Sequence, residues 1–145
     1  MIDTDAFLRQ EVESASPAKL RWLLLQKAHG LTLSVRDLWQ MGLAEDAKQW
    51  LILVQDIFTE LLQGIVDPKH ELATQQSDLY VFLTKLLVLA SQTQDTETLK
   101  NLTEILEIER DSWEMLVRRE VSESYSTSAS TQSAEETYTG FDFSA

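Results

Sequence analysis

The sequence of 145 residues contains no cysteine, which excludes disulfide frameworks, thiolate catalysis and metal sites ligated by sulfur. Glycine and proline are scarce, with 4 and 2 residues, and this argues against the many turns of an all-β fold. Basic residues are also few, because 12 Lys and Arg stand against 24 Asp and Glu, giving a net charge of −12. Nucleic-acid binding needs clustered cations that neutralise phosphates, so a nucleic-acid partner is disfavoured.

Long apolar runs are missing as well. The most apolar stretch, residues 79–90, contains Lys85 and falls short of the ~20 residues that a transmembrane helix needs. Residues 1–10 lack the apolar run of a secretory signal. We therefore expect a soluble, cytoplasmic protein without membrane insertion.

Apolar residues at helical spacing predict four helices. Ser16-Pro17 combines an N-cap residue with a proline suited to the first helical position, and the first helix should end near Met41-Gly42. The second should end at Gly64, the third should begin near Glu71, and the fourth should follow Asp95 as N-cap and end near Arg119. Helices of this length joined by short connections predict an all-α fold, an antiparallel up-down four-helix bundle.

The chain divides into three parts on this interpretation. Residues 1–15 form a short N-terminal segment, residues 16–120 the four-helix bundle, and residues 121–145 an acidic Ser/Thr-rich tail. The last part holds seven Ser, four Thr and four acidic residues but no basic one, and it shows no helical period. We expect this tail to be disordered, because it lacks the apolar surface that offsets the loss of conformational entropy on folding.

The sequence shows none of the common arrangements of catalytic or metal-binding residues. Helical bundles often hold metals with Glu-x-x-His pairs, but Gln26 precedes His29 and Asp67 precedes His70 at that spacing. Carboxylate pairs such as Asp56/Glu60 and Glu104/Glu107 lie on polar helix faces. No Gly-rich phosphate loop or nucleophile elbow is present. We predict no metal, no cofactor and no enzymatic activity.

The apolar stripes do not account for all of the large apolar residues. Six of them fall outside the main stripes: Trp22, Leu25 and Trp39 in the first helix, and Tyr80, Phe82 and Leu89 in the third. They belong either to a wide core stripe with aromatic residues at its edge or to a groove that receives another chain, because exposed aromatic patches mark interaction surfaces.

The N-terminal sequence resembles a known family. Phe7, then Val12-Glu13-Ser14-Ala15-Ser16-Pro17-Ala18-Lys19-Leu20, is similar to the opening of the FliS family of flagellin-specific flagellar export chaperones. The similarity continues through Leu51-Ile52-Leu53-Val54-Gln55-Asp56-Ile57 with Glu60-Leu61, through Leu79-Tyr80, Leu87, Ala90 and Asp95, and ends with the Arg-x-x-Trp pattern of Arg110-Asp111-Ser112-Trp113. It covers about residues 7–117. Two departures stand out: Phe7 replaces the usual Tyr, and Leu24-Leu25-Gln26-Lys27 replaces Leu-Tyr-Asp/Asn-Gly.

The resemblance implies a cytoplasmic chaperone that binds the C-terminal segment of flagellin, prevents its premature polymerisation and aids type III export. An amphipathic client segment would lie in apolar grooves. In this family the N-terminal segment can occupy part of the groove when no client is bound, and here that plug would be Phe7 and Leu8. The flagellar export gate and an anti-sigma factor are further partners that the resemblance suggests. The partner-binding residues expected on this basis are Phe7, Leu8, Trp22, Leu25, Trp50, Val54 and Tyr80.

Two other classes of function remain open at this stage. The chain could be a structural bundle that forms a homodimer through its Trp-rich faces, and such a protein would self-associate without a client. A homodimer that exists only when the chaperone is free of client is a related alternative. An enzyme is the third and most remote class, since nothing supplies a nucleophile, a metal site or a cofactor loop.

Overall fold

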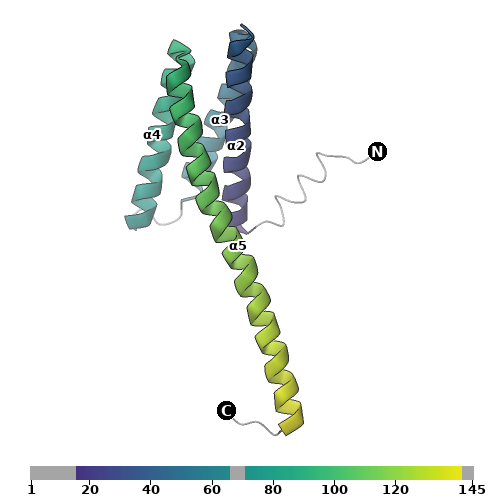
Figure 1. Ribbon diagram of the computed structural model, residues 1–145. Helices are drawn as coiled ribbons and strands as arrows, with labels where there is room; N and C mark the ends of the chain where they lie inside the picture. The colour runs from purple at the N-terminus through teal and green to yellow at the C-terminus, as the bar shows by residue number, and fades with distance from the viewer. Residues whose placement is uncertain (1–15, 66–70, 142–145) are drawn as a thin grey trace.

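A computed structural model of the chain describes residues 16–65 and 71–141, with side chains in the last helix up to Ser126. These residues form four helices: α2 (Pro17–Gln40), α3 (Ala44–Gln63), α4 (Glu71–Thr93) and α5 (Thr96–Phe141). Helix α2 packs against α3, α3 against α4, α4 against α5, and α5 returns to α2. Figure 1 shows these helices side by side, with α5 continuing beyond the other three. The predicted all-α antiparallel four-helix bundle is confirmed.

The helix boundaries follow from local residue chemistry. The Ser16 hydroxyl accepts a hydrogen bond from the Lys19 amide at 3.1 Å, and Pro17 occupies the first turn of α2. After α2 the chain turns at Gly42, which has a φ of 75° that favours glycine. Before α5, the Asp95 carboxylate accepts hydrogen bonds from the Glu97 amide and the Thr98 hydroxyl. The predicted caps Ser16 and Asp95 are therefore confirmed.

The core lies along the centre of the bundle, where one stripe from each helix is buried. Leu31, Val54, Ile57, Leu61, Leu83 and Leu106 are buried there, while Leu24, Leu86 and Trp113 are partly buried against them. Two residues placed outside the stripes belong to this core, because Leu25 and Tyr80 have no exposed surface. Among the described residues, the core also includes Ala28, Val35, Ala47, Leu51, Phe58, Leu87, Ala90, Leu99 and Leu102.

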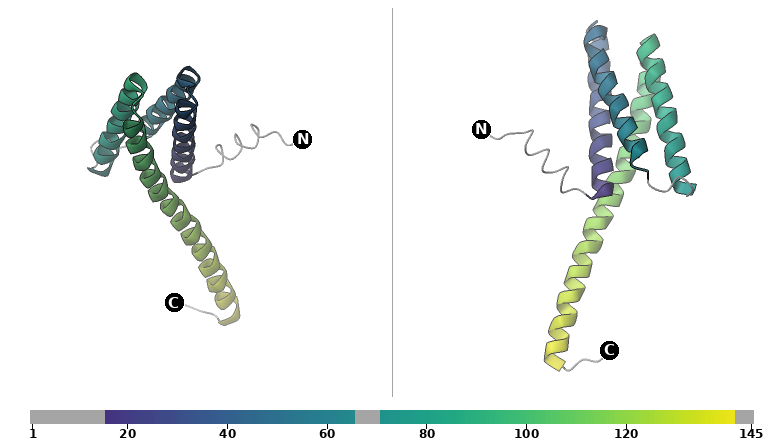
Figure 2. Two further views of the ribbon diagram at one scale, coloured as in Figure 1. Left: turned by 45° about the horizontal axis from the view of Figure 1, so that its top comes forward. Right: turned by 180° about the vertical axis from the view of Figure 1, so that it is seen from behind.

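The end of the last helix differs from the prediction. We expected the helix to end near Arg119 and residues 121–145 to be a disordered tail, but α5 continues as a helix to Phe141. Neither glycine nor proline interrupts the sequence between Thr96 and Gly140, so no helix-breaking residue ends α5 near Arg119. Figure 2 shows that this extension leaves the bundle without folding back onto it.

Truncation after Glu120 is expected to leave the thermal unfolding midpoint of the bundle nearly unchanged. In the extension, Val121 is 65% and Tyr125 80% exposed, so these side chains add little buried apolar area. Differential scanning calorimetry of the full chain and of residues 1–120 measures the effect. A fall of several degrees in the truncated chain would show that the extension docks on the bundle, and would contradict a domain boundary at residue 120.

Candidate protein-binding surfaces

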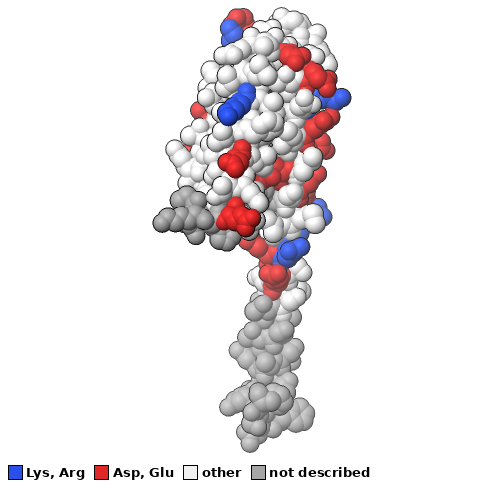
Figure 3. Space-filling model, turned by 90° about the vertical axis from the view of Figure 1, so that its left-hand side faces the viewer, with Lys and Arg blue, Asp and Glu red and all other residues white. Residues whose placement is uncertain are grey.

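Helix α4 presents a group of four exposed apolar residues. Val81, Phe82, Val88 and Leu89 are between 39% and 48% exposed, and we call them the outer face of α4. In Figure 3, which views the side of the bundle where α4 lies, uncharged surface is broad and acidic residues gather along the right-hand edge. Exposed apolar groups in one patch are typical of a protein-binding surface.

Two grooves lie beside α3, and the first of them adjoins the outer face of α4 at Val88. The groove between α3 and α4 encloses about 290 Å³ and is lined by Leu51, Ile52, Leu87 and Val88 together with polar side chains. A second groove, of about 260 Å³, lies between the start of α2 and the end of α3. Its walls are Pro17, Leu20, Arg21, Leu24, Glu60, Leu61, Gln63 and Gly64. Both grooves follow the direction of the helices, as an amphipathic helical ligand requires.

A buried polar cluster lies inside the bundle near the second groove. The Glu109 carboxylate, 8% exposed, accepts hydrogen bonds from the Tyr80 hydroxyl at 3.1 Å and the Trp113 indole N–H at 2.8 Å. Burial, with the Glu109 charge as a second cause, raises the pKa of Tyr80 to about 12. The Tyr80 hydroxyl therefore stays protonated and donates to Glu109.

Arg21 connects this cluster to the end of α3. Its guanidinium carbon lies 5.3 Å from the centre of the Tyr80 ring and 5.1 Å from that of Trp113, which are cation–π distances. One Arg21 N–H donates to the Leu61 carbonyl at 3.1 Å, and this carbonyl belongs to the last turn of α3, where carbonyls lack partners within the helix. Arg21 thus links α2 to α3, α4 and α5.

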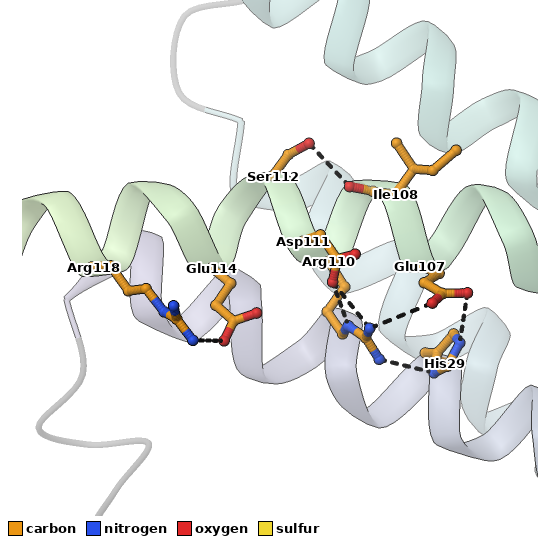
Figure 4. A network of polar contacts seen from close by, with 8 residues as sticks. All are labelled: His29, Glu107, Ile108, Arg110, Asp111, Ser112, Glu114 and Arg118. Atoms are coloured by element: carbon orange, nitrogen blue, oxygen red, sulfur yellow. Dashed lines mark hydrogen bonds and ion pairs between the residues drawn. The ribbon is translucent and has the colours of Figure 1, made fainter.

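His29 forms a second polar network between α2 and α5 (Figure 4). An Arg110 N–H lies 3.2 Å from His29 Nδ1, and His29 Nε2 lies 4.0 Å from the Glu107 carboxylate. Arg110 also bonds Asp111 at 2.9 Å. Burial is the main cause that lowers the pKa of His29, and the charge of Arg110 is the second. Neutral His29 can accept from Arg110 and direct its other N–H toward Glu107.

The lowered pKa of His29 predicts that the bundle loses stability as the pH falls. The unfolded chain binds a proton near the ordinary pKa of 6.5 and the folded chain only at lower pH, so His29 stabilises the fold above 6.5 and this stability is lost on acidification. The measurement is urea unfolding between pH 5 and 8 for the parent and for His29→Gln. His70 is present in both, so only the difference between the two curves reports on His29. If the free energy of unfolding changes equally with pH in the parent and in His29→Gln, the prediction is contradicted.

The structure places the expected partner-binding residues in three different settings. Leu25, Val54 and Tyr80 are fully buried, so they shape the walls of the bundle and do not face solvent. Trp22 and Trp50 are half-buried, and Trp50 packs against the core. The five residues therefore do not converge on one open groove. The proposed plug residues Phe7 and Leu8 lie outside the residues that the structure describes.

Several residues that shape these surfaces were not predicted from the sequence. Phe82 and Leu89 were recognised as surplus apolar residues, but Val81 and Val88 were not, although their spacing of seven residues places them on one side of α4. Arg21 and Glu109 also escaped notice. Arg21 bonds Leu61 and Glu109 bonds Tyr80 on other helices, and no spacing along the chain signals these contacts. The bond from Trp113 to Glu109 joins residues four apart on α5, and that spacing could have indicated it.

Within residues 16–65 and 71–141, no group of three or more His, Asp or Glu side chains could hold a metal ion. None of the helices in this part of the chain is long and apolar enough to cross a membrane. An all-helical bundle with apolar side chains exposed on an outer face and in two grooves has the features of a protein that binds other polypeptides.

Comparison with known families identifies which proteins of this class the chain resembles. The family of flagellar protein FliS matches residues 3–120, which includes the four-helix bundle and most of the N-terminal segment. The chain belongs to the FliS family. This is the flagellar export chaperone family, so the general chaperone role follows from membership. A search of curated proteins found no match.

Proposed function

We propose that this protein is a cytoplasmic flagellar secretion chaperone that binds the C-terminal segment of flagellin, prevents premature polymerisation and aids type III export. The observation that carries the proposal is the family match over residues 3–120 on a bundle that exposes apolar side chains. Shielding of an aggregation-prone amphipathic segment requires such a surface, because burial of apolar area is the main favourable term in most protein association.

The proposed client contacts use the half-buried tryptophans as anchors. Trp22 on α2 and Trp50 on α3 each retain some exposed surface, whereas Leu25, Val54 and Tyr80 are fully buried and act only through the shape of the bundle. Phe7 and Leu8 would occupy part of the client-binding groove until the flagellin segment binds. The flagellar export gate and an anti-sigma factor are further proposed partners. The non-enzymatic role and the cytoplasmic location also belong to this proposal.

The test is calorimetric titration of the full chain with a peptide of about 40 residues from the C-terminus of the flagellin encoded in the same genome. We expect one-to-one binding with an affinity that changes little with salt, because apolar burial and not charge drives association. Absence of heat and of complex at tens of micromolar, with a folded bundle confirmed by circular dichroism, would contradict the proposal.

Variants locate the client contacts in the same titration. Trp50→Asp is expected to abolish binding, because it places a charge where an apolar anchor should be buried. Val121→Asp is the matched control, since Val121 lies on the α5 extension and is 65% exposed. Phe7→Ala should bind at least as tightly as the parent if Phe7 competes with the client. Circular dichroism of Trp50→Asp separates loss of binding from loss of folding.

A further inference from the structure

In the part of the chain that the structure describes, the outer face of α4 stays exposed after the bundle has formed. Its apolar residues come as two pairs seven positions apart, Val81/Phe82 and Val88/Leu89, which is two turns of an α-helix. Each of these side chains is at least 39% exposed. A repeat of seven residues is the spacing with which one helix packs along another over several turns.

The charged residues of α4 follow the same repeat. The helix has three of them, Glu71, Asp78 and Lys85, at intervals of seven residues, so they lie along one line of the helix surface. Asp78 and Lys85 stand on either side of the Val81/Phe82 pair, and both are exposed. In the part of the chain that the structure describes, neither forms an ion pair.

This order of charges makes the face complementary to itself. If two α4 helices lie antiparallel with a two-fold axis between Val81 and Phe82, Asp78 of each copy faces Lys85 of the other. The same axis brings the two Val81/Phe82 pairs together at the centre of the contact. Closed two-fold interfaces are built from one self-complementary patch of this kind.

We propose that a second copy of this chain docks on the outer face of α4 in this antiparallel register. The net charge of −12 opposes self-association in general, but at the proposed axis each copy contributes one cation and one anion, so the local charge balances. The inference concerns self-association alone and does not depend on the identity of the client.

The proposed contact is small, because it consists mainly of one pair of helices. Interfaces at the low end of the size range are weak and transient, and we expect a dissociation constant on the order of tens of micromolar. Such a dimer would form in concentrated samples and separate on dilution.

Sedimentation velocity of the full chain over a concentration series from about 5 to about 200 µM spans the expected dissociation constant. Phe82→Glu is expected to weaken the dimer at least tenfold, because it places a carboxylate at the centre of the contact. Leu53→Glu is the matched control: Leu53 lies on α3, and at 42% its exposure is close to that of Phe82 at 48%. This control should dimerise like the parent.

A charge exchange tests the register. Asp78→Lys and Lys85→Asp should each weaken the dimer, since each leaves like charges opposite one another, and the double variant D78K/K85D should restore it by recreating both pairs in reverse. A merely structural effect of either substitution would not be rescued in this way.

The proposal has clear contrary outcomes. A parent chain that stays monomeric at every concentration while circular dichroism shows it folded would overturn it. So would a dimer that Leu53→Glu disrupts and Phe82→Glu does not. A dimer that D78K/K85D fails to restore would reject the antiparallel register. Because titration with the flagellin peptide is a separate measurement, none of these outcomes decides whether the chaperone proposal holds.

Discussion

Replacing Leu106 by alanine is expected to lower the free energy of unfolding by about 2 to 5 kcal/mol, the range for removing a large buried aliphatic side chain. Leu106 has no exposed surface and lies in the core contributed by all four helices. The loss combines the transfer free energy of the missing methyl groups with the cavity that remains. It would be a large fraction of the stability of an ordinary domain.

Urea denaturation followed by circular dichroism measures this difference, and α5 itself provides the control. Ile108 lies two residues further along the helix and is 67% exposed, so Ile108→Ala should change the free energy of unfolding by less than about 0.5 kcal/mol. Equal effects of the two substitutions would show that the buried side of α5 has been misassigned.

Replacing Glu109 by alanine is the second change with a large expected effect, about 2 to 4 kcal/mol. The substitution removes the acceptor for both the Tyr80 hydroxyl and the Trp113 indole, and each buried donor left without a partner costs about 1 to 3 kcal/mol. Chemical denaturation again gives the free energy. A loss below about 0.5 kcal/mol, the level of an ordinary surface substitution, would contradict the structural importance of the cluster.

A further variant at the same position separates hydrogen bonding from charge. Glu109→Gln keeps an oxygen acceptor, so it should be milder than Glu109→Ala. Glu104→Ala is the surface control on the same helix, because Glu104 is exposed and, unlike Glu107, takes no part in the His29 network. In a double-mutant cycle, Tyr80→Phe should destabilise the parent but have less effect in Glu109→Ala, since the bond between the two residues is then already lost.

The sequence was sufficient to predict the bundle because its signals are local. Ser16-Pro17, Gly42, Gly64 and Asp95 mark helix ends through capping and turn chemistry, which depends on a few adjacent residues. The buried side of α2 was less accurately predicted. The stripe was drawn through apolar residues alone, but Thr32 is fully buried and its hydroxyl bonds the His29 carbonyl at 2.7 Å. When Thr32 is counted among the buried residues of α2, the buried stripe of this helix shifts toward Leu25.

The candidate surfaces were harder to predict because they depend on contacts between helices. Tyr80 was an expected client contact, yet its hydroxyl bonds Glu109 and its ring packs below Arg21, and no spacing along the chain joins these three residues. The length of α5 was missed for a different reason. A Ser/Thr-rich composition suggested a tail, but neither glycine nor proline interrupts residues 121–139, so no helix-breaking residue stops α5 there.

The projecting end of α5 has a practical consequence for attaching probes to this protein. The helix has 46 residues, and at a rise of 1.5 Å per residue it is about 70 Å long. Its far end therefore lies well away from the outer face of α4 and from both grooves (Figure 1). A fluorophore, affinity tag or surface linker joined near Phe141 would leave these surfaces accessible, whereas one joined beside Ser16 would lie next to the groove between α2 and α3.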